Sequence, residues 1–164
     1  MSRSVGFDDF VAARSTALLR TAYLLTRDHG VAEDLLQTAL AKAWFHWDRI
    51  DGPPEPYVRK ILVNTYTSWW RRRWNGERAT EDLPDAGTDD PADAAGASHD
   101  LWAALGRLPR RQRAVVVLRY FEDQSEAETA RLLDCSVGTV KSQASRALAK
   151  LRIDPALAPE EGQA

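Results

Sequence analysis

Small, hydroxyl-bearing and basic side chains recur at helical spacing near the end of the sequence. Steps of three and four residues from Gly138 lead to Lys141, Ser142 and Ser145, with Arg146 beside them. Glycine and serine permit close approach to a partner, while lysine and arginine can bond phosphates or base edges. The spacing predicts a helix that contacts DNA in the major groove, although a solvated helix face is the alternative. The predicted DNA-contacting residues are Ser136, Gly138, Thr139, Lys141, Ser142, Ser145 and Arg146.

A second polar and basic stripe lies in the middle of the sequence. Its members fall on one side of a predicted helix and are Lys60, Asn64, Thr67 and Arg71. The opposite side of the same helix carries Val58, Ile61, Leu62 and Trp69. Because arginine and lysine neutralise phosphates and asparagine can bond a base edge, this stripe also suits a nucleic-acid surface.

The charges are segregated along the chain, although the net charge of -2 taken alone argues against a nucleic-acid partner. Residues 57–78 carry six basic side chains and one acidic side chain, and residues 79–100 carry seven acidic and no basic ones. Residues 101–152 then carry ten basic and five acidic side chains, with Arg110, Arg111 and Arg113 at the start of the predicted DNA-binding unit. Two basic modules that flank an acidic spacer are typical of a DNA-binding protein.

Helices must position both stripes, because apolar residues recur at helical and not at alternating spacing. Two amphipathic helices are expected within 7–25 and 31–47, followed by a short proline-rich loop and the helix of the middle stripe. Four helices are expected later, in 101–108, 112–121, 125–133 and 136–151. Ser125 and Glu128 form a capping box, and Ser136 can cap the last helix. The last two helices form a helix-turn-helix pattern, so the predicted fold class is all-α with no sheet.

One segment between the expected helices has low hydrophobicity and like charges, which oppose its collapse into a core. We therefore expect it to separate two helical domains. We expect an N-terminal helical domain over 7–76 and a flexible acidic linker over 77–99. A helix-turn-helix domain should follow over 100–152, and a disordered tail over 153–164.

Several function classes find no support in the sequence. No paired carboxylates, nucleophile motif or phosphate-binding glycine loop is present, so we expect no catalytic residue, no cofactor and no enzymatic activity. The one cysteine, Cys135, should pack in a turn as a small hydrophobe, and no metal site is expected. No apolar run is long enough for a membrane span or a signal peptide, which predicts a cytoplasmic protein.

The run LPRRQRAVVVLRYFEDQSEAETARLLDCSVGTVKSQASRALAKL, from Leu108 to Leu151, resembles region 4 of sigma factors. LuxR-type regulators carry a similar GTVK-bearing helix. This resemblance by itself therefore implies DNA binding and no more, and the first half of the chain must discriminate between the two families.

The segment AEDLLQTALAKAW, from Ala32 to Trp44, resembles region 2.2 of extracytoplasmic-function (ECF) sigma factors. Its buried side would use Leu35, Leu36, Ala39, Leu40 and Trp44. In that family the opposite face docks on the coiled coil of the polymerase beta-prime clamp. The resemblance thus implies that Asp34, Gln37 and Ala41 bind core polymerase.

The segment PYVRKILVNTYTSWWRRRW, from Pro56 to Trp74, is similar to sigma regions 2.3 and 2.4. The resemblance implies that this helix binds the minus-10 element through Tyr57, Arg59, Lys60, Asn64, Thr67, Ser68, Arg71 and Arg72. It places the strand-separating pair at Tyr57 and Val58, and part of a flipped-base pocket in the loop from Asp51 to Glu55. Trp69 is assigned to packing.

Together these resemblances imply a two-domain ECF sigma factor of the sigma-70 family. Such a protein would bind core RNA polymerase through its beta-prime clamp and beta flap, and would read the minus-10 element with region 2 and the minus-35 element with region 4. Promoter DNA is the second implied partner, and an anti-sigma factor is a further one. The alternative is a LuxR-like helix-turn-helix regulator with a helical N-terminal sensor.

Overall fold

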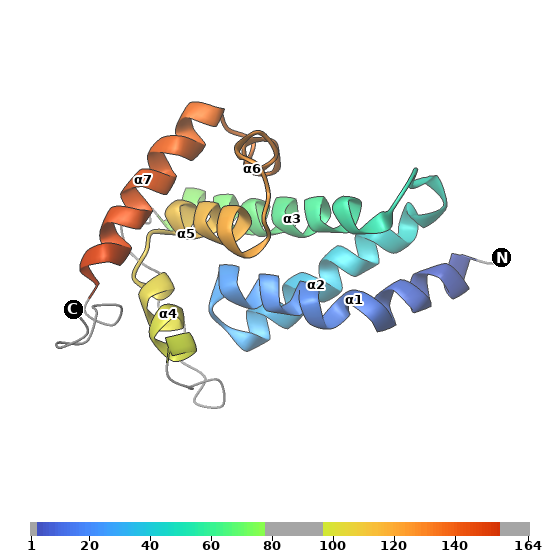
Figure 1. Ribbon diagram of the computed structural model, residues 1–164. Coiled ribbons are helices and arrows are strands. Elements are labelled where there is room, and N and C mark those ends of the chain that lie inside the picture. Colours follow the sequence, from blue (N-terminus) through green and yellow to red (C-terminus); the bar gives the residue numbers. More distant parts are fainter. Residues whose placement is uncertain (1–2, 78–96, 155–164) are drawn as a thin grey trace.

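A computed structural model describes residues 3–77 and 97–154, which fold into helices joined by short turns (Figure 1). Within these two ranges no residue forms a strand, which confirms the all-α prediction. Most of the predicted linker, residues 78–96, and the end of the predicted tail, residues 155–164, lie outside the described residues.

Three long helices build the N-terminal domain, in which α1 (Arg3–Thr26) packs against α2 (His29–Phe45) and α2 packs against α3 (Pro54–Glu77). The turn between α1 and α2 is tight, because Arg27 adopts a left-handed backbone with a φ of 58°. Asp28 then caps α2 by accepting a hydrogen bond from the amide of Val31 at 3.1 Å. The second helix therefore begins at His29, before the apolar stripe that predicted it.

The connection from α2 to α3 contains a single turn, η1 (Trp47–Arg49), and a short loop. Gly52 in that loop has a φ of 78°, a conformation that glycine adopts without steric cost. Pro54 starts α3, where its missing amide hydrogen is not needed, so two of the prolines that predicted a loop lie in the first turn of the helix. Val58 and Leu62 are fully buried along the inner side of α3.

The C-terminal domain begins with α4 (Ala97–Gly106) and α5 (Arg110–Val116). The chain then continues without a break into η3 (Val117–Phe121), which has π-helical winding. The helix predicted over 112–121 is therefore two segments that start at Arg110.

The helix-turn-helix pair consists of α6 (Glu126–Leu133) and α7 (Val137–Ile153). The Ser125 hydroxyl accepts a hydrogen bond from the amide of Glu128 at 3.0 Å, as the predicted cap requires. The Glu128 carboxylate bonds Arg131 and completes no reciprocal cap, so only one half of the predicted capping box forms. Asp134 turns the chain with a left-handed φ of 55°.

The end of α7 continues into the tail predicted to begin at residue 153. Ile153 is the last residue of the helix, and the following residue, Asp154, is buried. Its carboxylate accepts a hydrogen bond from Arg107 at 2.8 Å, which ties the end of α7 to the turn after α4.

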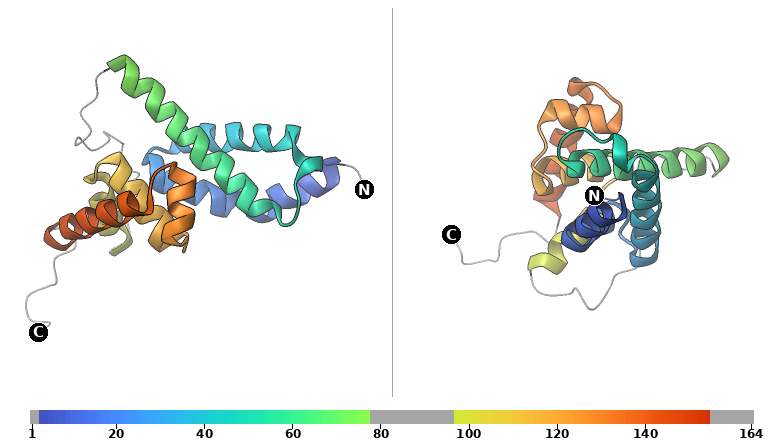
Figure 2. Two further views of the ribbon diagram at one scale, coloured as in Figure 1. Left: turned by 90° about the horizontal axis from the view of Figure 1, so that it is seen from above. Right: turned by 90° about the vertical axis from the view of Figure 1, so that its right-hand side faces the viewer.

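The helices of the two domains lie side by side (Figure 2), and their buried side chains form a shared apolar core. Leu25 and Leu62 of the N-terminal domain and Val115 and Leu118 of the C-terminal domain belong to one buried cluster. Helix α6 contacts both α3 and α7 and lies between them. The packing places the helix-turn-helix pair next to the helix that carries the middle stripe.

Candidate DNA and polymerase interface

The outer face of α7 is the first part of the candidate site. Its polar and basic positions are exposed, with Thr139 half-buried, and they are Ser136, Gly138, Lys141, Ser142, Ser145 and Arg146. The opposite side of the helix buries Val140, Ala144 and Ala147 against the domain core. The structure thus brings the residues predicted from helical spacing together on one accessible face.

The start of α7 is held by hydrogen bonds among the same residues. Ser136 Oγ accepts from the amide of Thr139 at 3.0 Å and lies 2.9 Å from the Thr139 hydroxyl. The Ser142 hydroxyl donates to the main-chain oxygen of Thr139 at 3.2 Å. These contacts fix the first turn, which is the part of a recognition helix that reaches the base edges.

Gly138 lies on this face, where the neighbouring atoms leave enough room for a larger residue. A Cβ atom added there would meet only Ser136 Oγ, at 3.8 Å, which is ordinary contact. Its backbone is helical, so no left-handed conformation requires glycine. The open space above Gly138 favours close approach of a partner to the backbone.

The Gly138→Ala variant tests this interpretation. We expect unchanged or slightly higher stability, by up to about 1 kcal/mol, because alanine is the better helix former. We expect weaker binding of the duplex, because a methyl group then separates the helix from the groove floor. Thermal unfolding followed by circular dichroism and DNA binding measured by anisotropy check the two effects, and equal DNA affinity of both proteins would contradict the close approach.

Helix α3 presents the middle stripe as the second part of the candidate site. Lys60, Asn64, Arg71 and Arg72 are exposed, and Thr67 and Ser68 are half-buried. The Thr67 hydroxyl donates to the main-chain oxygen of Asn64 at 3.0 Å. Trp69 packs against the core, as predicted.

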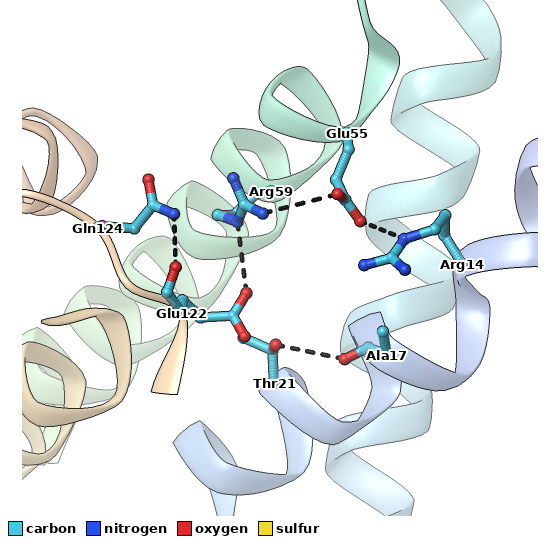
Figure 3. Close-up of polar contacts among 7 residues, drawn as sticks. All are labelled: Arg14, Ala17, Thr21, Glu55, Arg59, Glu122 and Gln124. Atoms are coloured by element: carbon cyan, nitrogen blue, oxygen red, sulfur yellow. Dashed lines mark hydrogen bonds and ion pairs between the residues drawn. The ribbon is translucent and has the colours of Figure 1, made fainter. Parts of the chain in front are cut away.

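Two predicted minus-10 positions are oriented differently from the rest of the stripe. The Arg59 side chain is only 16% exposed and pairs with Glu122 of the C-terminal domain at 3.3 Å (Figure 3). Val58, the second member of the predicted strand-separating pair, is fully buried, whereas Tyr57 is half-buried. The exposed polar and basic stripe of α3 therefore includes fewer residues than the sequence predicts.

The outer face of α2 is the third part of the candidate site. Asp34, Gln37 and Ala41 are exposed there. The other side of the helix packs into the core through Leu35, Leu36, Ala39 and Leu40, as predicted, whereas Trp44, also predicted on the buried side, is only half-buried. A hollow beside the exposed face is lined by Phe7, Val11, Gln37, Leu40, Ala41, Trp44 and Phe45. The Phe45 side chain is 70% exposed beside this hollow, and the sequence pattern did not single it out, because it follows the apolar stripe by one residue.

The charge pattern predicted that Arg113 supports DNA binding, and the structure shows that this prediction is wrong. Its side chain is fully buried, and its Nε donates to the main-chain oxygen of Leu25 at 3.0 Å. Of the three arginines expected to support DNA binding, only Arg111 is exposed, while Arg110 is half-buried over the Trp70 ring. Leu25 lies near the end of α1, where a cation is favoured by the helix dipole.

Cys135 packs half-buried against the core in the turn before α7, as predicted. Burial raises the pKa of its thiol above the ordinary value, which keeps the sulfur protonated and unreactive near neutral pH.

Metal-ligand clusters and membrane-spanning helices are absent from the described part of the chain. Residues 3–77 and 97–154 hold no group of three or more His, Cys, Asp or Glu side chains arranged to bind a metal. Among the helices in these ranges, none is both long and apolar enough to cross a bilayer.

Two basic helix faces, on α3 and α7, and an acidic and polar face on α2 are thus exposed on an all-α scaffold, an arrangement typical of a DNA-binding protein. Residues 10–76 match the model for sigma-70 region 2, and residues 98–151 match the model for sigma-70 region 4. The chain belongs to the sigma-70 family and has the two-region organisation of ECF sigma factors. The region 2 match removes the alternative of a LuxR-like regulator with an unrelated sensor.

Relatives of known name agree with this assignment. The chain is 45% identical over 148 residues to the RNA polymerase sigma-E factor of Streptomyces avermitilis, covering 89% of this chain and 83% of that protein. It is 43% identical over 154 residues to the RNA polymerase sigma-E factor of Streptomyces coelicolor, covering 93% and 87%. It is 30% identical to the ECF RNA polymerase sigma factor SigL of Mycobacterium tuberculosis, covering 85% and 82%.

Solved structures resemble the whole fold. The sigma factor RpoE of Bartonella quintana, in complex with the anti-sigma factor NepR, superposes with a TM-score of 0.66 at 26% identity, covering 88% of this chain and 93% of that chain. CnrH in complex with the cytosolic domain of CnrY superposes with a TM-score of 0.60 at 23% identity, covering 90% and 85%, a likeness of fold alone.

Proposed function

We propose that this chain directs core RNA polymerase to promoters and opens them for transcription initiation. The observation that carries the proposal is the presence, in one chain, of two exposed basic faces on α3 and α7 and a separate exposed acidic and polar face on α2. A regulator that only binds DNA does not need the third face. The names of the three relatives above, all RNA polymerase sigma factors, support the same role.

Residues on two different helices bind the duplex and the opened strand of the promoter. The α7 face, with Lys141 and Arg146, reads the minus-35 element as duplex in the major groove. The α3 face, with Asn64 and Arg71, captures the strand of the minus-10 element after melting. The segment from Asp51 to Glu55, which runs from the loop into the first turn of α3, forms part of the pocket for a flipped base.

The α2 face supplies the contact with the polymerase. Asp34, Gln37 and Ala41 dock on the beta-prime clamp, and the C-terminal domain contacts the beta flap. The exposed Phe45 beside them adds apolar area to the same contact. An anti-sigma factor is a further partner, since the structural relative RpoE was solved in complex with the anti-sigma factor NepR.

The chain itself is proposed to carry no catalytic activity, because nucleotide addition belongs to the polymerase. The protein is proposed to act in the cytoplasm, where polymerase and genome are found.

Reconstitution with core polymerase on genomic DNA tests the proposed function. Mapping of transcript starts should show initiation at discrete sites that depend on the added chain. The free chain should bind promoter duplex weakly and in a salt-sensitive manner, because each basic face is small and phosphate contacts weaken with salt.

A further inference from the structure

The segment proposed to form part of the base pocket, from Asp51 to Glu55, has no anchor of its own in the core. Every residue in this pocket segment is exposed or half-buried. The nearest buried side chains along the chain are those of Ala43 before it and Val58 after it. A loop with no buried side chain opens more easily than the elements that it connects, whereas a pocket that selects one base needs a fixed shape. Contacts from another part of the protein must therefore hold the segment.

One face of α1 supplies a contact on the entry side of the pocket segment. The connection between α2 and α3 lies beside the N-terminal half of α1 (Figure 2). Steps of three and four residues place Phe7, Phe10 and Arg14 on one side of this helix. The rings of Phe7 and Phe10 contact the ring of Trp47, with centroids 5.2 and 5.4 Å away. Because Phe10 is itself buried, these contacts tie the chain just before the segment to the core.

The same face of α1 holds the other end of the pocket segment through an ion pair (Figure 3). Arg14 Nε donates to Oε1 of Glu55, and the second Glu55 oxygen lies 3.9 Å from Arg59. Glu55 is in the first turn of α3, where the helix dipole favours a carboxylate. Its side chain is 30% exposed, so this pair is screened less than a fully exposed one. Both ends of the segment are thus fixed to one helix.

The geometry favours a positioning role for Arg14 over a direct contact with a DNA phosphate. Its guanidinium already faces a carboxylate, which cancels much of its attraction for a second anion. It also lies on α1, outside the polar and basic stripe of α3. Its partner Glu55, in contrast, belongs to the pocket segment, so Arg14 can act on the base through that segment.

We propose that Arg14 is a positioning residue for the minus-10 base pocket. With Phe7 and Phe10 it fixes the pocket segment against α1, and through Glu55 it keeps the segment in the shape that admits one base and rejects the others. This inference rests on the proposed function. Because the ion pair is partly exposed, its loss should cost little stability, and its effect should appear in the choice of base.

Base choice by the holoenzyme tests the positioning role. Four promoters differ only at the minus-10 base that unstacks, located beforehand as the position where 2-aminopurine becomes brighter on binding. Arg14→Ala should reduce the ratio of the tightest to the weakest affinity by about threefold to fivefold, mainly by weakening the preferred promoter. The melting temperature of the chain should change by less than about 4 °C. Arg20→Ala, which removes another exposed cation of α1, is the matched control and should leave the ratio unchanged.

Two further variants separate positioning from a phosphate contact. Glu55→Gln should reduce the affinity ratio as much as Arg14→Ala does, and the double variant no more than either alone, because all three remove one contact. Arg14→Lys keeps the charge and should restore the ratio to within about twofold. A uniform loss of affinity on all four promoters by Arg14→Ala, with Glu55→Gln unaffected, would assign Arg14 to a DNA phosphate and overturn the proposal. An unchanged ratio in Arg14→Ala would overturn it as well.

Failure of the proposed function is recognised separately. In that case the unsubstituted chain gives no initiation with core polymerase on any of the four promoters. Failure of the positioning role instead leaves initiation and base choice of the unsubstituted chain intact, and only the variants depart from the expected ratios.

Discussion

Replacing Lys141 and Arg146 together with alanine should reduce closed-complex formation on duplex promoter by about 30-fold or more, because each removed base or phosphate contact is worth about 1 to 3 kcal/mol. Both side chains are exposed on α7, so folding should be unaffected. Footprinting of the holoenzyme on one duplex promoter measures the effect. Lys150→Ala with Arg152→Ala is the matched control, since it removes two exposed basic groups from the last turn of the same helix.

A premelted bubble at the minus-10 element should not restore binding by this variant, because the lost contacts are to duplex DNA. Asn64→Ala with Arg71→Ala should behave differently and impair capture of the melted strand, seen as lower permanganate reactivity in the bubble region. If both double variants lose duplex binding equally and neither alters strand opening, the proposed division of labour between α7 and α3 is wrong.

Replacing Asp34 with lysine and Gln37 with alanine should weaken holoenzyme assembly by about 10-fold to 100-fold, as expected for a reversed charge and a lost contact within an interface. Helical content should remain unchanged, because both side chains point away from the buried stripe of α2. Titration of labelled chain with core polymerase gives the affinity. Glu33→Lys is the control, since Glu33 is an exposed acid on the adjacent position of the same helix. An unchanged affinity of the double variant would show that α2 does not dock on the clamp.

The sequence predicted best what depends on local periodicity. The apolar stripes of α2, α3 and α7 repeat every three to four residues, so the exposed faces opposite them could be assigned before the structure was known. The caps at Ser125 and Ser136 were equally predictable, because an N-cap depends on residues within one turn. Whether the exposed residues contact DNA or polymerase stays a prediction.

Long-range packing was beyond the sequence pattern. Arg113 stands among other arginines in the sequence, and nothing local shows that it is the one that turns inward to Leu25, 88 residues away. The pairing of Arg59 with Glu122 likewise depends on how the two domains meet. The helical period predicts which side of each helix is apolar, but not which polar side chain near its edge is covered by another domain.

Initiation by core polymerase with and without the chain tests the central claim most directly. Purified core polymerase and the chain are combined on genomic DNA, and the starts of the transcripts are mapped. The account predicts discrete starts that require both proteins and that share sequence elements near minus-10 and minus-35. Absence of such starts with both proteins, together with tight and specific duplex binding by the chain alone at physiological salt, would contradict it.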